Sequence, residues 1–196
     1  LCKNTSGLYN VAMGSGALSS NTTASANVGI GRLALTTNTT GANNVAIGCC
    51  ALKSNTTASN NVAVGFESLK SNTEGGSNAA VGTNALTANT TGSSNNAFGS
   101  TALDNNTTGS SNTAIGNDAL DANTTASDNV AVGNGAMFAN TTGCQNTAIG
   151  RRALNTNITG DNNVAVGFCA LKLNTADNNT AVGFCSLACN TTGTNQ

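Results

Sequence analysis

Apolar and polar positions follow one another along the chain in a pattern that repeats at a nearly fixed interval. The glycine of an Ala-(Val/Ile)-Gly step recurs at every seventeenth position from Gly14 to Gly167, and a last interval, shorter by one residue, leads to Gly183. The unit reads N-x-A-(V/I)-G-x-x-A-L-x-x-N-T-T-G-x-x. Such internal repetition is typical of solenoids. Because the period covers residues 1–196, we expect a single repeat domain, and we expect it to be a segment of a longer chain because its first residues already lie within a repeat.

The length and composition of the unit favour one coil of a parallel β-solenoid. Helix-pair repeats need about 33 residues or more, and Gly, Asn and Thr are poor helix formers. At about 3.3 Å per residue, a coil of this length traces a path of about 55 Å, enough for two short strands and two turns. We therefore predict an all-β fold of about eleven coils, each one repeat long, stacked at about 4.8 Å through parallel ladders.

Two apolar columns are predicted to form the core of the coil. The residue before the glycine is always apolar, as in Ile47 and Val64, and the residue four places after it is Leu except at Met137. Each column is preceded by a small residue, usually Ala. Because neighbouring strand residues point to opposite faces, the small column indicates a second covered face, over which a neighbouring chain would pack. The alternative is that Ala occupies a tight corner of the coil.

Two columns of Asn, beginning at Asn4 and Asn10, predict turns joined by amide ladders from coil to coil. The first column also matches the N-x-(S/T) acceptor pattern for N-glycosylation, which is the alternative interpretation of the same residues. The candidate acceptors are Asn21, Asn38, Asn55, Asn89, Asn106, Asn123, Asn140, Asn157 and Asn190.

The seven cysteines form no C-x-x-C metal-binding pattern. Cys169 and Cys185 occupy the same phase of adjacent coils, so their Cα atoms are expected to lie about 4.8 Å apart, within the disulfide range of about 4.4–6.8 Å. This spacing predicts a disulfide between them. The alternative is that all seven are free thiols at outward positions.

Composition and charge exclude several classes of function. The chain has no His, its charged residues make up 8%, and its net charge is −1. No imidazole catalyst and no basic surface for nucleic acid are therefore available, and no apolar run reaches the roughly 20 residues of a membrane helix. Like charges stack at Lys53 and Lys70 and at Asp104 and Asp121, which marks the position after Leu as solvated. We expect no enzyme activity, no cofactor and no metal site.

Three segments, Asn44–Gly48, Asn61–Gly65 and Asn163–Gly167, resemble the N-x-A-(V/I)-G repeats of trimeric autotransporter adhesin heads. The longer unit, with A-L-x-x-N-T-T-G, is similar to repeats of tail-fibre-like proteins of phages and marine bacteria. The resemblance implies a left-handed parallel β-roll, assembly as a homotrimer, a surface or virion location and a role in attachment.

The leading hypothesis from the sequence is a non-enzymatic fibre or adhesin shaft that is extracellular, on a cell surface or on a virion. Its partners would be copies of itself and a receptor or glycan, without nucleic acid and without membrane insertion. The first alternative is a subunit of an extracellular filament that grows head to tail. The second alternative is a solenoid that binds ice or carbohydrate.

Overall fold

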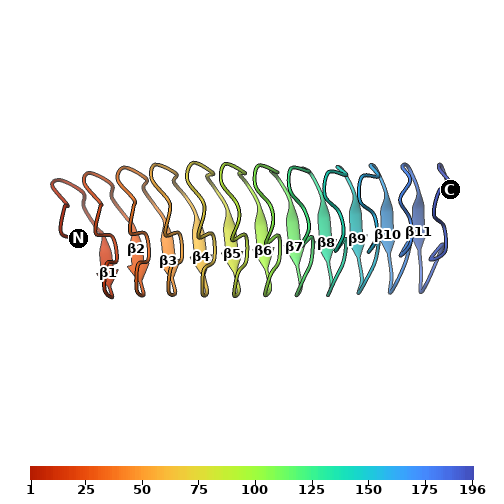
Figure 1. Cartoon of the computed structure of the whole chain (residues 1–196), viewed down its shortest axis with the longest axis horizontal. Coiled ribbons are helices and arrows are strands. Elements are labelled where there is room, and N and C mark those ends of the chain that lie inside the picture. Colours follow the sequence, from red (N-terminus) through yellow and green to blue (C-terminus); the bar gives the residue numbers. More distant parts are fainter.

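Eleven short strands, one from each repeat, stack side by side into a single parallel sheet along an elongated rod (Figure 1). The computed structural model describes all residues, 1–196. The pairing is in register, so that Val45 lies opposite Val62 and Ala46 opposite Ala63. This topology confirms the predicted β-solenoid. The strands are β1 (Val11–Met13), β2 (Val28–Ile30), β3 (Val45–Ile47), β4 (Val62–Val64), β5 (Ala79–Val81), β6 (Asn96–Phe98), β7 (Thr113–Ile115), β8 (Val130–Val132), β9 (Thr147–Ile149), β10 (Val164–Val166) and β11 (Thr180–Val182).

Each coil contains one strand of three residues, whereas the sequence analysis predicted two strands per coil. The coil closes through turns at residues with left-handed backbone conformation. In the coil of β6 these residues are Thr101, Leu103 and Ser111, with φ of 57°, 54° and 61°. Left-handed backbone is uncommon for residues other than glycine. The repeat therefore turns the chain at fixed left-handed positions, and only three residues of each coil form a strand.

The periodic glycine ends each strand at a point where the next coil lies in close contact with it. Gly99 has φ of 145°, and a Cβ placed on it would lie 2.4 Å from the carbonyl oxygen of Gly116 in the next coil. Both the backbone conformation and the approach of the next coil require glycine at this position.

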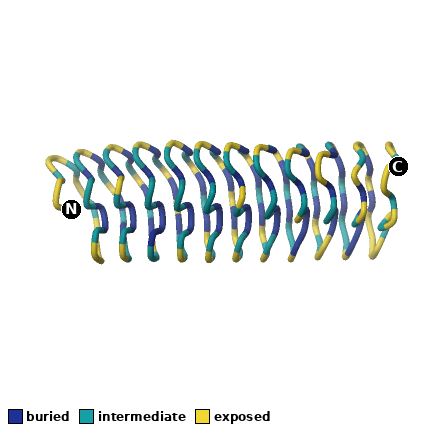
Figure 2. Tube along the Cα trace, viewed as in Figure 1, coloured by how far each residue is buried: buried dark blue, intermediate teal, exposed yellow.

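The core consists of the Ala and Leu columns, which corrects the predicted core. The central Ala of each strand from β3 to β10 and the Leu column from Leu18 to Leu171 are fully buried, with Met137 replacing one Leu. A Cβ placed on Gly29, the one glycine among the central strand residues, would lie 3.2 Å from Cγ of Leu18. The coil is so narrow that no residue larger than Ala occupies the position opposite Leu. The larger Val and Ile side chains therefore point outward, and buried positions recur in every coil along the rod (Figure 2).

Both Asn columns form buried amide ladders, as predicted. Asn55 Nδ2 donates to Asn38 Oδ1 at 2.8 Å and to the carbonyl oxygen of Ala58 at 3.0 Å. In the other column, the backbone N–H of Asn61 donates to Asn44 Oδ1 at 3.0 Å. Buried polar groups are costly unless they are hydrogen-bonded, so these ladders make a polar interior compatible with the fold.

The single coil that is one residue short interrupts the first ladder. Asn174 Nδ2 does not reach the preceding ladder residue and donates to Ala176 O at 2.7 Å and to Asn163 Oδ1 at 3.4 Å. As a result, Asn157 Oδ1 is buried without a hydrogen-bond partner. The loss of one residue thus leaves a specific defect in the rod.

Candidate interaction face

The outward side of the sheet is an apolar surface that runs along the rod. We call it the outer sheet face and define it by the first and third residues of β1–β11. Phe98, Ile115 and Ile149 are about 40% exposed, whereas the central residue is buried in every strand from β2 to β11. The third residues are Met13, Ile30, Ile47, Val64, Val81, Phe98, Ile115, Val132, Ile149, Val166 and Val182; the first are Val11, Val28, Val45, Val62, Ala79, Asn96, Thr113, Val130, Thr147, Val164 and Thr180.

The outer sheet face carries no charge. Its polar members are Asn96 and the three threonines Thr113, Thr147 and Thr180, all at first positions. The backbone groups of the strands are engaged in the ladders between coils. Single exposed apolar residues are ordinary on protein surfaces, but a contiguous row of them marks an interaction site. This face therefore offers a partner an almost purely apolar contact.

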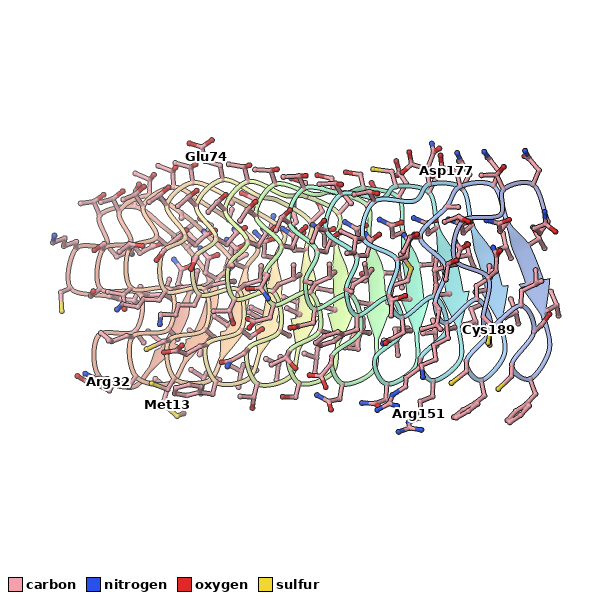
Figure 3. The ribbon with its side chains drawn as sticks, turned by 45° about the vertical axis from the view of Figure 1, so that its right-hand side comes forward. Met13, Arg32, Glu74, Arg151, Asp177 and Cys189 are labelled. Atoms are coloured by element: carbon pink, nitrogen blue, oxygen red, sulfur yellow. The ribbon has the colours of Figure 1, made fainter.

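Exposed aromatic rings extend the apolar surface beside the last strands. Phe168 and Phe184, each two residues after a strand, stack with ring centroids 5.3 Å apart. The guanidinium carbon of Arg151 lies 5.7 Å from the centroid of the Phe168 ring, a cation–π contact. Arg151 projects from the same edge of the rod as Met13 and Arg32, while Glu74 and Asp177 lie at the opposite edge (Figure 3).

The stacked charges after the Leu column are half-buried, where the sequence predicted solvated positions. Burial, followed by the nearby carboxylates of Asp104 and Asp118, raises the pKa of Asp121 to about 6. Burial also raises the pKa of Asp104, and a hydrogen bond with Thr87 opposes that rise. Lys70 is part of an ion pair, 2.9 Å from Glu67 in the same coil.

The predicted disulfide between Cys169 and Cys185 is not formed in the structure. All seven cysteines are free thiols; Cys169 is buried and Cys185 is exposed. The sequence neighbours Cys49 and Cys50 are in contact, with their Sγ atoms 3.5 Å apart. Burial, and after it a hydrogen bond with Cys49, raises the pKa of the Cys50 thiol. The repeat therefore aligns Cys169 and Cys185 without bonding them.

The candidate glycosylation residues lie in the first Asn ladder. Asn21, Asn38, Asn55, Asn89, Asn106, Asn123, Asn140 and Asn157 are fully buried, and Asn190 is partly exposed. In Asn89, both hydrogens of the amide nitrogen are used, toward Asn72 Oδ1 at 2.8 Å and Gly92 O at 2.9 Å. A glycan and the ladder would compete for the same nitrogen. The glycosylation hypothesis therefore concerns a chain whose coils have not yet closed.

Metal-ligating side chains do not gather on the rod. No three side chains of the His, Cys, Asp or Glu type come together in a way that could hold a metal ion. The structure also contains no helix with the length and hydropathy of a membrane span.

Comparisons of the chain with protein-family models, with curated proteins and with solved structures find no match. The function is therefore inferred mainly from the geometry of the outer sheet face.

Proposed function

We propose that this chain is a structural, non-enzymatic shaft of an extracellular or virion fibre, in which copies pack side by side through the outer sheet face. The observation that supports this most directly is the uncharged apolar surface that β1–β11 leave uncovered. Apolar surface of this extent is favourable to bury, at about 25 cal/mol per Å².

The occupant of the face is a second copy of the same chain. Side chains on the face form rows about 4.8 Å apart, and another sheet with the same spacing would interdigitate with them along its whole length. Two columns over eleven strands give about 600 Å² per chain. With the flanking phenylalanines, the area approaches the roughly 800 Å² per partner of a stable interface.

Closed symmetry suits this side-by-side arrangement. Homo-oligomers usually close around an axis, and three rods that turn their apolar faces toward a common axis would remove those faces from water. The resemblance to trimeric adhesin heads and tail-fibre-like repeats supports the number three and a location outside the cell or on a virion. The head-to-tail filament of the alternative hypothesis would leave the outer sheet face exposed, so the side-by-side trimer is favoured.

The mass in solution tests the proposal. Sedimentation equilibrium of the whole chain is expected to give three times the 19.2 kDa of a single chain. Ile115→Lys, in the middle of the face, is expected to give a monomer because it would bury an unpaired charge. Thr108→Lys, at an exposed position away from the face, is the matched control and should remain a trimer.

Two results would contradict the proposal. A wild-type chain that stays monomeric at high concentration would show that the outer sheet face has no partner of its own kind. A mass that grows without limit in both variants would favour the head-to-tail filament.

A further inference from the structure

A cavity of about 290 Å³ interrupts the surface of the rod beside β8, and it is the one cavity that the structure contains. It lies on the turns that follow the strands, so it is distinct from the outer sheet face. Its lining residues are Asp118, Asn134, Gly135, Phe138, Arg152 and Asn155.

The cavity exists because one side chain is missing from a column. The position two residues after the periodic glycine carries a side chain in nine of the eleven coils, and the two exceptions are Gly16 and Gly135. At Gly135 the backbone keeps the left-handed conformation of the column, with φ of 62°. The neighbouring coils place Asp118 and Arg152 on its two sides, and Phe138 closes the edge of the cavity.

The cavity is electrically polarised along the rod. Asp118 lines its N-terminal side, and Asp121 stands next to Phe138 in the preceding coil. Arg152 lines the other side, with Arg151 beside it. The ion pair between Lys70 and Glu67 is the only one in the structure, so Asp118 and Arg152 do not neutralise each other. Two coil spacings separate their Cα atoms by about 9.6 Å.

The donors and acceptors that remain free in the cavity define which groups a ligand must supply. Asp118 Oδ1 already accepts from Thr101 Oγ1 at 2.6 Å and from Asn117 Nδ2 at 2.9 Å, which leaves Oδ2 available. Asn155 uses its amide nitrogen on Gly135 O at 2.7 Å, and its side-chain oxygen accepts nothing. The N-terminal side therefore presents the free oxygen of Asp118, while the other side, to which Asn155 also belongs, offers the donors of the Arg152 guanidinium in a planar fork suited to a carboxylate.

We propose that this cavity binds a zwitterion of the α-amino-acid class, with its ammonium group on Asp118, its carboxylate on Arg152 and an apolar side chain against Phe138. An ammonium–carboxylate separation of about 3 Å plus two hydrogen bonds of about 2.8 Å gives about 8.6 Å, which is comparable to the Cα separation of about 9.6 Å between Asp118 and Arg152. The proposal does not depend on the proposed shaft function.

Calorimetric titration of the whole chain with three related probes tests this proposal. L-Phenylalanine carries both charges, N-acetyl-L-phenylalanine lacks the ammonium group, and L-phenylalaninamide lacks the carboxylate. For a ligand of this size in an open cavity, we expect a dissociation constant of about 1–10 mM for L-phenylalanine. Each derivative is expected to bind about tenfold more weakly, since it loses a charged hydrogen-bonding group.

Variants with matched controls locate the site. Gly135→Asn would fill the cavity without disturbing the coil, because a Cβ there meets only ordinary contacts at 3.6 and 3.8 Å and Asn84 adopts the same conformation in the same column, with φ of 57°. This variant, Asp118→Asn and Arg152→Gln are expected to lose binding. Asp128→Asn and Arg32→Gln, which lie elsewhere on the rod, are expected to bind as the wild type does.

Three results would overturn the proposal. The first is no heat of binding with L-phenylalanine at several times the expected dissociation constant. The second is equal affinity for the amide and the amino acid, which would show that the carboxylate is not recognised. The third is unchanged binding by Gly135→Asn with its circular dichroism spectrum intact, which would place the ligand elsewhere.

Discussion

At the scale of single residues, the fold depends on side chains held in conformations that they rarely adopt. Leu103 is fully buried with φ of 54°. Left-handed backbone costs an L-residue about 1–2 kcal/mol, and burial of a Leu side chain contributes about 1.5–3 kcal/mol. The column is therefore stable only because each strained Leu fills the interior. Gly99 is under a tighter constraint, because it combines a conformation open only to glycine with contact to the next coil.

The glycine column gives the first prediction. Gly99→Ala is expected to destabilise the rod by at least about 3 kcal/mol, since the new methyl group would overlap the carbonyl oxygen of Gly116 and the backbone would be strained. Thermal unfolding followed by circular dichroism measures the effect. Gly135→Ala is the control, because its methyl group meets nothing closer than 3.6 Å, and it should lose only about 1 kcal/mol to the left-handed backbone. Equal losses in both variants would contradict this account.

The stacked carboxylates of Asp104 and Asp121 give the second prediction. The pKa of Asp121 rises from 3.8 to about 6 on folding, so the folded state binds the proton more tightly and its stability falls as the pH rises through this range. The unfavourable contribution is present in full above about pH 6 and lost near pH 4. Allowing for solvent screening of a half-exposed group, Asp121→Asn should stabilise the rod by about 1 kcal/mol at pH 7.5.

Chemical denaturation at pH 7.5 and pH 4 measures this difference. The gain from Asp121→Asn should disappear at the lower pH, and Asp128→Asn, which changes an exposed carboxylate, should show no gain at either pH. A gain that is the same at both pH values would mean that charge repulsion and burial are not its cause.

At the scale of the coil, the amide ladders convert a sequence period into a structural one. In the first ladder, every Asn after Asn4 except Asn174 donates to the equivalent Asn of the preceding coil and to the turn of its own coil, as at Asn72, whose two bonds measure 3.0 and 2.9 Å. The ladder tolerates variation in the outward residues but not in coil length. The short coil shows this, because the loss of one residue leaves Asn157 Oδ1 without a partner.

Repair of the short coil gives the third prediction. Insertion of Thr between Thr175 and Ala176 restores the N-T-T-A sequence of the coil at Asn123 and should allow Asn174 to donate to Asn157. Satisfying a buried acceptor is expected to stabilise the rod by about 1–3 kcal/mol, measured by chemical denaturation. The same insertion between Thr159 and Gly160, in a complete coil, is the control and should destabilise it. Stabilisation by both insertions would contradict the role of coil length.

The sequence alone predicted the period, the stacking and the ladders, because these follow from the spacing of Gly48, Gly65 and their equivalents. It failed on the interior, where it assigned Ile47 and its equivalents to the core. One feature of the sequence did indicate that this column points outward. Its residues vary in size and include Met13 and Phe98, whereas the central strand residue is almost always Ala. The sequence also did not indicate the left-handed backbone of Leu103 and its equivalents, which no propensity favours.

Much less of the two candidate sites could be predicted. The sequence indicated a second covered face but placed it over Ala, because it assigned the interior to the wrong column. The cavity at Gly135 arises from one absent side chain between Asp118 and Arg152, which belong to the repeats before and after it. Its polarity becomes visible only when the column is assembled in space.

At the scale of the whole molecule, the rod is stabilised by contacts between adjacent coils alone, as in other repeat proteins. Every strand contacts only the strands before and after it. The core formed by the Ala and Leu columns runs inside the coils and does not cover the outer sheet face, whose third residues, such as Ile115, stay exposed. The proposed association of rods would bury this face.

Association through this face gives the fourth prediction. If folded chains assemble through β1–β11, mass action makes the unfolding temperature rise with protein concentration. Calorimetric scans over a hundredfold range of concentration are expected to show this rise for the wild type and for Thr108→Lys, and to show none for Ile115→Lys. A wild-type unfolding temperature independent of concentration would argue against association of the folded chains.

The in-register pairing of equivalent residues, such as Val45 with Val62, also determines how the number of repeats in the gene can change. Recombination between two repeats removes or adds a complete unit, and each surviving unit still meets a neighbour of its own kind. Every such event changes the reach of the molecule by about 4.8 Å. The length of the rod can thus change by one coil at a time, without any change to the sequence of the other repeats.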